Sequence, residues 1–219
     1  MAILGISSAT KIISIGLVDQ EKVLAETTLA DCRTEKISFY IKEAGIEPRQ
    51  IEAVAVADGP GSYSGLRGGL ATAKSLAQSL KIPLIGISTM EAIALNLADI
   101  EGTMAVVLDA RLDEYNLTLF GAANGQIKRL TDDIVVKLDH LVAKLGKISG
   151  DLWIVGSTGE IKDKLTGKNY HFADDAHSHP YGSNVAKLGS LKLKTGQADD
   201  PLTLAPKYSH KPSIREFNR

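Results

Sequence analysis

The sequence predicts an α/β protein built from two similar lobes packed side by side. Short apolar segments and amphipathic helices follow the order βββαβα in the first half of the 219-residue chain, and this order recurs in the second half. The two halves share almost no residue identity, so the prediction depends on the order of the elements. We place the boundary so that residues 1–102 form an N-terminal lobe and residues 103–219 a C-terminal lobe.

The N-terminal lobe begins with three strands whose short connections indicate an antiparallel meander. A helix with Ile37, Ile41 and Ala44 on one face follows and ends at Gly45. Next come a strand buried on both faces, a glycine-rich loop and a long helix that ends at Leu80. The predicted strands are Ile3–Ser8, Ile13–Val18, Val23–Leu29, Ala53–Ala57 and Ile82–Ile87, and a capping box at Ser88–Glu91 begins a helix that runs to about Ala98.

The C-terminal lobe starts with a second group of three strands, and Asn124-Gly125 between the last two is a strong hairpin signal. A small-residue turn, Gly156–Gly159, precedes a helix, and the stretch 171–180 is polar and rich in turn residues. The predicted strands are Met104–Asp109, Glu114–Phe120, Gln126–Leu130 and Leu152–Val155, and the predicted helices include Leu138–Leu145 and Asn184–Lys194.

The composition excludes several classes of protein. A net charge of −1 argues against a broad basic surface for unaided nucleic-acid binding. One cysteine, Cys32, excludes an internal disulfide and a cysteine-based zinc site. The chain has no apolar run of about 18 residues and no basic leader. We therefore expect a soluble cytoplasmic protein that is not associated with a membrane.

The glycine-rich loop, DGPGSYSGLRGG at residues 58–69, allows two interpretations. Glycines before a helix can bring a phosphate to the helix N-terminus, or they can simply form a tight turn. A Walker A loop would place Lys-Ser/Thr where this chain has Leu66-Arg67, and the glycine spacing is one residue longer than the dinucleotide fingerprint. We favour the turn. The residues that would contact a phosphate in the alternative are Gly59, Gly61, Ser62 and Gly65.

The helix after this loop has two distinct faces. One face carries larger apolar residues at 4-3-4-3 spacing from Leu66 to Leu80 and should contact the core. The other face carries only small residues, which suit either a solvent-exposed surface or close contact with a helix of another protein. Phe39, roughly opposite the apolar face of the preceding helix, and Arg67 at the rim would extend such a contact. The predicted partner interface comprises Phe39, Arg67, Gly68, Thr72, Ser75 and Ser79.

The predicted order of elements is that of the actin-like ATPase fold, of sugar-kinase and Hsp70 type, which normally holds a nucleotide between its lobes. Catalysis in that fold needs a carboxylate at the end of the first strand, but this chain has Ser7-Ser8-Ala9-Thr10 there. The equivalent turn in the second half has Asp109 beside Arg111, which favours a salt bridge. His177 and His179 lack a cysteine or strong acid cluster nearby, so we predict no metal site and no catalytic residue.

The stretch ADGPGSYSGLRGGLATAKSLAQSLKIPLIGISTMEAI, residues 57–93, closely resembles the signature of the TsaB (YeaZ) family. Further matches are ILGISSATKIISIGL, VVLDARLDEYNLTLF and APKYSHKP. The resemblance implies that this chain is the dimerisation subunit of the bacterial machinery that transfers a threonylcarbamoyl group to N6 of the tRNA adenosine next to the anticodon. It implies a noncatalytic subunit that binds the catalytic paralogue TsaD, is joined by the ATPase TsaE, and pairs through the helices of its N-terminal lobe.

The resemblance also implies a homodimer when the chain is alone, contact with tRNA only through the complex, and no intrinsic cofactor. It leaves room for ATP or ADP at the interface of the complex. Where TsaD-like chains carry histidines at HxxxH spacing, this chain has Ser88–Ala92, with no metal ligand. Two departures from the family pattern are Ser7-Ser8 in place of Asp-Thr and Arg33 in place of a histidine.

The sequence alone leaves two other functions and one further contact open. A small actin-like ATPase or kinase would bind its own nucleotide between the lobes, and a metallopeptidase is suggested only by an old name for the fold class. The basic residues of the tail are either solvated or in contact with RNA phosphates. They are Lys207, Lys211, Arg215 and Arg219.

Overall fold

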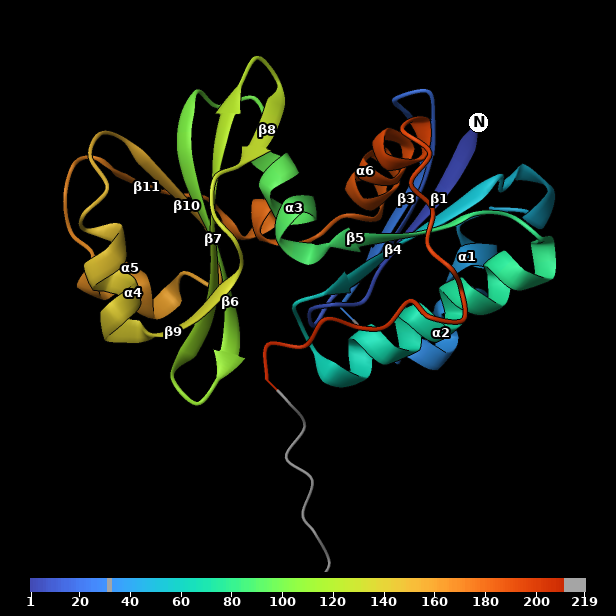
Figure 1. Ribbon diagram of the computed structural model, residues 1–219, viewed down its shortest axis with the longest axis horizontal. Helices are drawn as coiled ribbons and strands as arrows, with labels where there is room; N and C mark the ends of the chain where they lie inside the picture. Colours follow the sequence, from blue (N-terminus) through green and yellow to red (C-terminus); the bar gives the residue numbers. More distant parts are fainter. Residues whose placement is uncertain (31–32, 211–219) are drawn as a thin grey trace, which may run out of the picture.

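The computed structural model describes residues 1–30 and 33–210 and shows two β-sheets side by side, each with its own helices (Figure 1). The first sheet has the strand order β3-β2-β1-β4-β5. In it, β1 is antiparallel to β2 and parallel to β4, so that Ile6 lies beside Ile15 on one side and Val56 on the other. The predicted antiparallel meander is confirmed. The strands are β1 (Ala2–Ser7), β2 (Ile13–Asp19), β3 (Lys22–Leu29), β4 (Ala53–Gly59) and β5 (Leu84–Ser88).

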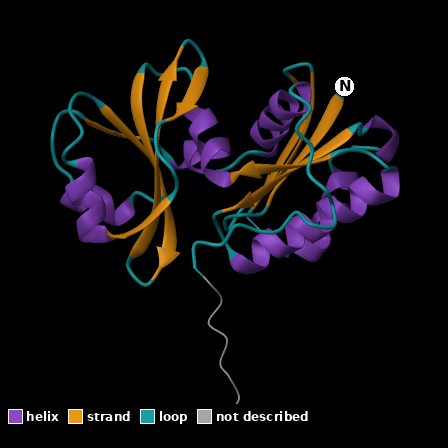
Figure 2. Ribbon diagram, in the orientation of Figure 1, coloured by secondary structure: helices purple, strands orange, loops and turns teal. Residues whose placement is uncertain are grey.

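Helices cover both faces of the first sheet (Figure 2). On one face lie α1 (Ile37–Glu43), preceded by the 3-10 turn η1 (Thr34–Lys36), and α2 (Tyr63–Leu80). The side chain of Ser62 caps the start of α2 by accepting a hydrogen bond from Gly65 N, and Lys81 ends the helix in the left-handed region with φ 57°. A second 3-10 turn, η2 (Pro48–Gln50), leads into β4.

The second sheet repeats the strand order of the first. Its order is β11-β10-β6-β7-β8, and β9 pairs with β7. The sequence did not predict the short strands β9 and β11, because four and three residues are too few to show a period and no hairpin signal marks them. The elements are β6 (Gly102–Arg111), β7 (Glu114–Ala123), β8 (Gln126–Arg129), β9 (Ile134–Lys137), α4 (Leu138–Leu145), β10 (Leu152–Gly156), α5 (Gly159–Lys164), β11 (Tyr170–Phe172) and the 3-10 turn η4 (Asp175–Ser178).

The last helix predicted in each lobe contacts the sheet of the other lobe. After β5, α3 (Thr89–Ala94) and the 3-10 turn η3 (Leu95–Leu97) lie between the lobes (Figure 1). Met90 and Ile93 of α3 pack with Phe120 of the second sheet. Conversely, α6 (Gly182–Lys194) packs on the first sheet. The predicted boundary at residues 102/103 places α6 in the C-terminal lobe, but in the structure α6, Lys207 and Tyr208 pack against the first lobe.

Two glycines of the first sheet, Gly5 and Gly16, allow α6 to approach it so closely. A Cβ atom on Gly5 would lie 1.9 Å from the backbone oxygen of Gly182, and one on Gly16 would lie 2.3 Å from Ser183 N. The start of α6 is also held by hydrogen bonds, from Gly182 N to Ser14 Oγ (2.9 Å) and from Ser183 N to Glu26 Oε2 (2.8 Å). These acceptors satisfy N–H groups that a helix start leaves unpaired. Glycine inside a strand can indicate such a close approach, and this was the signal available in the sequence.

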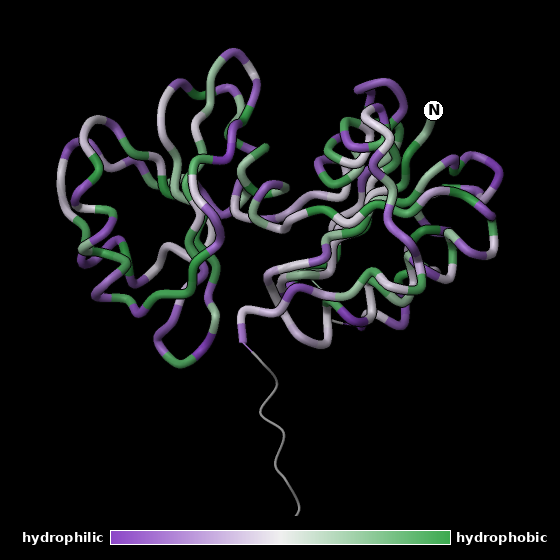
Figure 3. Tube along the Cα trace, in the orientation of Figure 1, coloured by the Kyte–Doolittle hydropathy of each residue, from purple (hydrophilic) through white to green (hydrophobic). Residues whose placement is uncertain are grey.

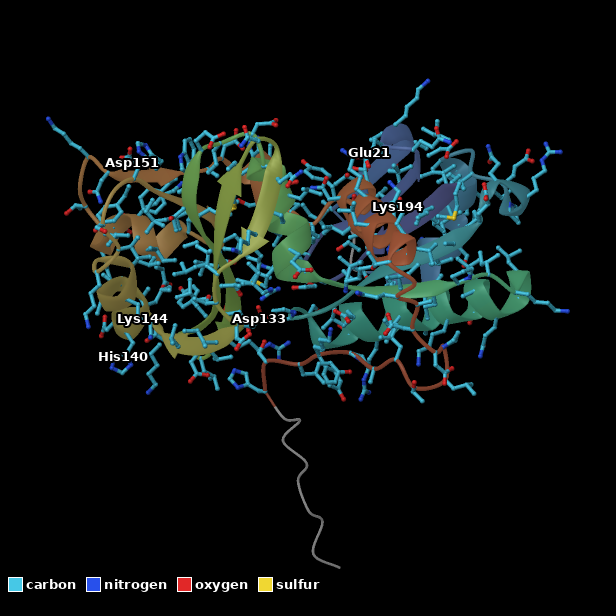
Figure 4. All side chains as sticks on the ribbon, turned by 45° about the horizontal axis from the view of Figure 1, so that its top comes forward. Glu21, Asp133, His140, Lys144, Asp151 and Lys194 are labelled. Carbon is cyan, nitrogen blue, oxygen red and sulfur yellow. The ribbon has the colours of Figure 1, made fainter. Side chains whose placement is uncertain are left out.

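The other end of α6 is fixed to the same lobe. Lys194 Nζ lies 4.0 Å from Glu21 in the β2–β3 turn, and Figure 4 shows the two labelled side chains beside each other. Apolar residues concentrate in the strands at the centre of each lobe, while the outer turns are hydrophilic (Figure 3). Among the described residues, no helix is both long and apolar enough to cross a membrane.

Candidate partner-binding face and interlobe cleft

Phe39 projects from the α1–α2 side of the first lobe. Its side chain is 55% exposed, whereas its neighbours Ile37 and Ile41 are buried in the core. The ring meets that of Tyr40 edge to face, with centroids 5.7 Å apart. Aromatic side chains, Phe included, are enriched in protein interfaces relative to the rest of the surface. Sequence reasoning placed Phe39 on this surface, and the structure agrees.

The small-residue side of α2 is open over only part of its length. Ser75 and Ser79 are exposed, while Thr72 is half-buried and its hydroxyl donates to Gly68 O at 3.0 Å. Gly68 is covered by the chain itself, since a Cβ there would lie 2.0 Å from Thr34 Oγ1. The opposite face of the helix is buried as the spacing predicted. Gly68 therefore serves the packing of η1 on α2, and the open surface lies nearer the C-terminal end of α2.

Arg67 belongs to an aromatic cluster that the sequence did not reveal. Its guanidinium carbon lies 4.0 Å from the centre of the Tyr63 ring, and its Nε donates to the Tyr208 hydroxyl at 2.9 Å. The Tyr63 and Tyr208 rings stack with centroids 4.7 Å apart. The tail motif APKYSHKP contains Tyr208 and was the available signal, but nothing in the sequence linked it to α2.

The glycine loop packs against other backbone segments of the chain. A Cβ atom on each of three loop glycines would press on a carbonyl oxygen. It would lie 2.1 Å from Lys207 O if added to Gly59, 2.3 Å from Ala9 O if added to Gly61, and 2.0 Å from Ser8 O if added to Gly65. Two of the loop N–H groups already have partners. Ser62 N donates to Ala9 O, and Gly65 N to the side chain of Ser62. Carbonyl oxygens repel an anion, so these contacts favour the structural turn over a phosphate cradle.

The turn after β1 also has a packing role. Ser8 is buried, and its hydroxyl donates to Gly65 O at 2.8 Å, which ties the end of β1 to the first turn of α2. Ser7 is buried as well, and its hydroxyl has no hydrogen-bond partner among the described residues. In the second lobe, Asp109 accepts a hydrogen bond from the backbone N–H of Arg111, at 2.7 Å. The first-strand turn, where catalysis in this fold would need a carboxylate, is built from Ser7, Ser8 and small neighbours instead.

A cleft of about 270 Å³ lies between the lobes and is lined by charged side chains. Arg129 of β8 joins the lobes across it: its Nε pairs with Glu91 at 3.1 Å, and it also contacts Asp133 and donates to Ser88 Oγ. Figure 4 shows Asp133 between the two lobes. The lining residues are Gly59, Ser88, Glu91, Arg129, Asp132, Asp133, Lys192 and Lys207.

Asp58, at the end of β4, is a buried carboxylate beside this cleft. It is 1% exposed, and its Oδ2 lies 2.8 Å from Lys207 Nζ, while its Oδ1 has no hydrogen-bond partner among the described residues. Burial raises the pKa of Asp58 above its ordinary value, and the pairing with Lys207 opposes this rise only in part. Of the tail residues predicted to be solvated or to contact RNA, Lys207 is thus bound to this carboxylate. Lys211, Arg215 and Arg219 lie outside the described residues.

The raised pKa of Asp58 predicts a specific dependence of stability on pH. The Asp58 carboxyl group holds its proton more tightly in the folded chain than in the unfolded chain, so ionisation of Asp58 lowers the stability of the fold. In the Asp58→Asn variant, residue 58 has no ionisable group. Relative to this variant, the wild type should lose stability as the pH rises from 3.8, the ordinary pKa of aspartate, through the raised pKa of Asp58. A tenfold difference in proton affinity between the folded and unfolded chains corresponds to about 1.4 kcal/mol. Urea unfolding of both proteins from about pH 4 to about pH 8 measures the difference, and a pH-independent difference would contradict this account.

The described residues contain no group of three or more His, Cys, Asp and Glu side chains placed to hold a metal ion. His177 instead pairs with Asp174, with Nδ1 and Oδ1 2.5 Å apart. The backbone oxygens of His177 and His179 accept hydrogen bonds from Asn96. These histidines therefore contribute to the junction of η4 with η3.

Two sheets of the same strand order, joined by crossing helices beside a cleft, define an actin-like ATPase fold. A family model described as TsaD, tRNA N6-adenosine threonylcarbamoyltransferase, matches residues 25–188. The chain belongs to this family, and within it to the TsaB (YeaZ) members. Both the fold and the family expected from the sequence are thereby confirmed.

Two relatives that are named TsaB match most of the chain. The tRNA threonylcarbamoyladenosine biosynthesis protein TsaB of Bacillus subtilis is 28% identical over 219 residues, which cover 95% of this chain and 93% of that protein. TsaB of Escherichia coli is 29% identical over 167 residues, 73% of this chain and 72% of that protein. The structure of YeaZ from Pseudomonas aeruginosa superimposes with a TM-score of 0.79 at 16% identity, covering 94% of this chain and 99% of that chain, and shows the common fold.

Proposed function

We propose that this chain is a noncatalytic subunit in the synthesis of threonylcarbamoyladenosine in tRNA, and that it acts by binding TsaD. The TsaB relatives bear the name of this pathway, and the family model bears the name of the transferase. The observation that carries the proposal is the exposed surface of α1 and α2. Phe39 is exposed on α1, the short side chains of Ser75 and Ser79 are exposed on α2, and both helices pack on the same face of the first sheet.

A helix of a partner can approach such a surface closely. Short side chains reduce the separation between two helices, and a close approach increases the number of dispersion contacts. Arg67 and Tyr63, at the first turn of α2, offer a polar rim to the same surface. An apolar centre with a polar rim is the usual arrangement of a protein interface.

The chemistry of the first-strand turn supports a noncatalytic role. The Ser8 hydroxyl donates its hydrogen bond to Gly65 O. Neither Ser7 nor Ser8 can supply the carboxylate that holds magnesium or activates water in this fold. We therefore propose that the chain has no intrinsic cofactor, that any ATP or ADP binds at the interface of the complex, and that TsaE joins there. Contact with tRNA would then come through the complex, and the free chain would pair with itself through the same surface.

The test is to purify the chain with tagged TsaD from the same organism and to assay tRNA modification with and without it. We expect a stoichiometric complex and a strong dependence of modification on the chain. Failure to bind TsaD, or full modification by TsaD alone, would refute the proposal. Calorimetry of the free chain with ATP and magnesium addresses the alternative enzyme: micromolar binding with turnover would favour an ATPase or kinase.

A further inference from the structure

Residues 199–210, which we call the strap, follow α6 and run along the first lobe towards the second (Figure 1). The strap begins on the edge of the first sheet. Asp199 N donates to Leu84 O, and Gly86 N donates to Asp199 Oδ2, both at 2.8 Å. Leu204 packs against the core of the first lobe. This first part is therefore anchored by backbone pairing and by apolar contact.

The middle of the strap is held at the end of β4 and at the start of α2. Lys207 N donates to Asp58 O at 2.7 Å, and Lys207 Nζ pairs with the buried carboxylate of the same residue. Gly59 makes room for this approach, because any side chain there would strike the backbone of Lys207. Tyr208 then stacks on Tyr63. The strap is thus bonded to the first lobe at several independent points.

The end of the strap reaches the second lobe. His210 Nε2 lies 3.1 Å from the Oε2 atom of Glu114, the first residue of β7. Both side chains are partly exposed, and an exposed pair of this kind contributes little stability. The strap is therefore held firmly by one lobe and weakly by the other.

The crossing helices form a separate junction between the lobes. Asn184 of α6 donates to Ala92 O (3.1 Å) and to Asn96 Oδ1 (2.5 Å), and Asn96 in turn donates to the backbone of η4. The interlobe cleft takes its walls from both lobes, and Lys207 of the strap is one of its lining residues. A movement that separated the end of the strap from the second lobe would have to break the contact between His210 and Glu114.

We propose that the strap is a latch that holds the two lobes closed and releases at its second-lobe end. Release breaks the His210–Glu114 contact and leaves the strap on the first lobe. The lobes can then separate around the junction of Asn96 with Asn184, with loss of the hydrogen bond from Arg129 to Ser88 across the cleft. The latch belongs to the free chain and does not depend on the binding of TsaD.

Distances between spin labels on the two lobes test this latch. In a Cys32→Ser background, labels at Gln78→Cys on α2 and Ala143→Cys on α4 report the separation of the lobes, because the two positions are exposed helix residues, one on each lobe. Pulsed electron–electron double resonance gives the distance distribution. We expect a narrow distribution for the wild-type strap and an additional population at longer distance in His210→Ala and in Glu114→Ala.

The controls separate loss of the latch from general damage. Asp151→Asn weakens a similar contact, His171 Nε2 to Asp151 Oδ1 at 3.3 Å, that lies wholly within the second lobe, and it should leave the distribution unchanged. Tyr208→Ala removes the stacking of the strap on Tyr63, which loosens its middle, and should add the same long population. His210 is exposed, so His210→Ala should fold normally. Distributions of His210→Ala and Glu114→Ala that superimpose on the wild type would overturn the proposal.

Discussion

Replacing Gly5 by alanine is expected to lower the free energy of unfolding by about 3 kcal/mol or more. The added methyl group would lie 1.9 Å from Gly182 O and 2.6 Å from Ala186 N, so α6 would have to move away from β1. Such a movement would also stretch the hydrogen bond from Gly182 N to Ser14 and separate buried apolar surfaces. Urea unfolding monitored by circular dichroism measures the change.

Gly159→Ala is the matched control for this substitution. Gly159 begins α5, and a Cβ there would meet no atom within 4 Å. Alanine favours a helix over glycine by up to about 1 kcal/mol, so this variant should be as stable as the wild type or slightly more stable. If Gly5→Ala proved as stable as Gly159→Ala, then α6 would not press on β1 as the structure describes.

Replacing Ser75 by arginine is expected to weaken binding to TsaD by about 30-fold or more, equivalent to about 2 kcal/mol. Ser75 is exposed at the open part of the α2 surface, where the long charged side chain would hold a partner helix away and would lose its water on binding. Titration of TsaD with the purified variant, by calorimetry or interferometry, gives the affinity. The same variant should reduce tRNA modification in the reconstituted system.

Ala143→Arg provides the comparison. Ala143 is an exposed residue of α4 in the second lobe, so the change adds the same side chain to a helix surface far from the proposed interface. Both variants should melt at the temperature of the wild type. If the wild type, Ser75→Arg and Ala143→Arg bound TsaD equally, α2 would not be part of the interface, and any contact with TsaD would lie elsewhere.

Patterns local in the sequence predicted most elements and part of the candidate interface. The 4-3-4-3 spacing placed Leu66, Leu70 and Ala73 in the core, and all three are buried. The same spacing predicted that Ser75 and Ser79 are exposed, because they lie on the side of the helix that faces away from the core. These predictions succeed because the repeat of a helix or strand is set by neighbouring residues.

Contacts between distant parts of the chain could not be predicted in this way. Arg67 and Tyr208 are 141 residues apart, and no local pattern indicates that their side chains meet. Gly68 appeared to belong to an open stripe, but Thr34 of another element covers it. The packing of α6 on the first sheet depends on the fit of Gly5 and Gly16 to this helix, which a hydrophobic period does not encode.

The packing of α6 on the first sheet has a consequence for synthesis on the ribosome. Ile3, Ala55 and Ile85 are covered by a helix that begins at Gly182, although the last strand of their sheet ends at Ser88. At about 5–20 residues per second, the intervening hundred or so residues take roughly 5–20 s to translate. During that interval the nascent first sheet lacks the cover for one apolar face. The growing chain therefore completes its first lobe only after the strands and helices of the second lobe have been synthesised.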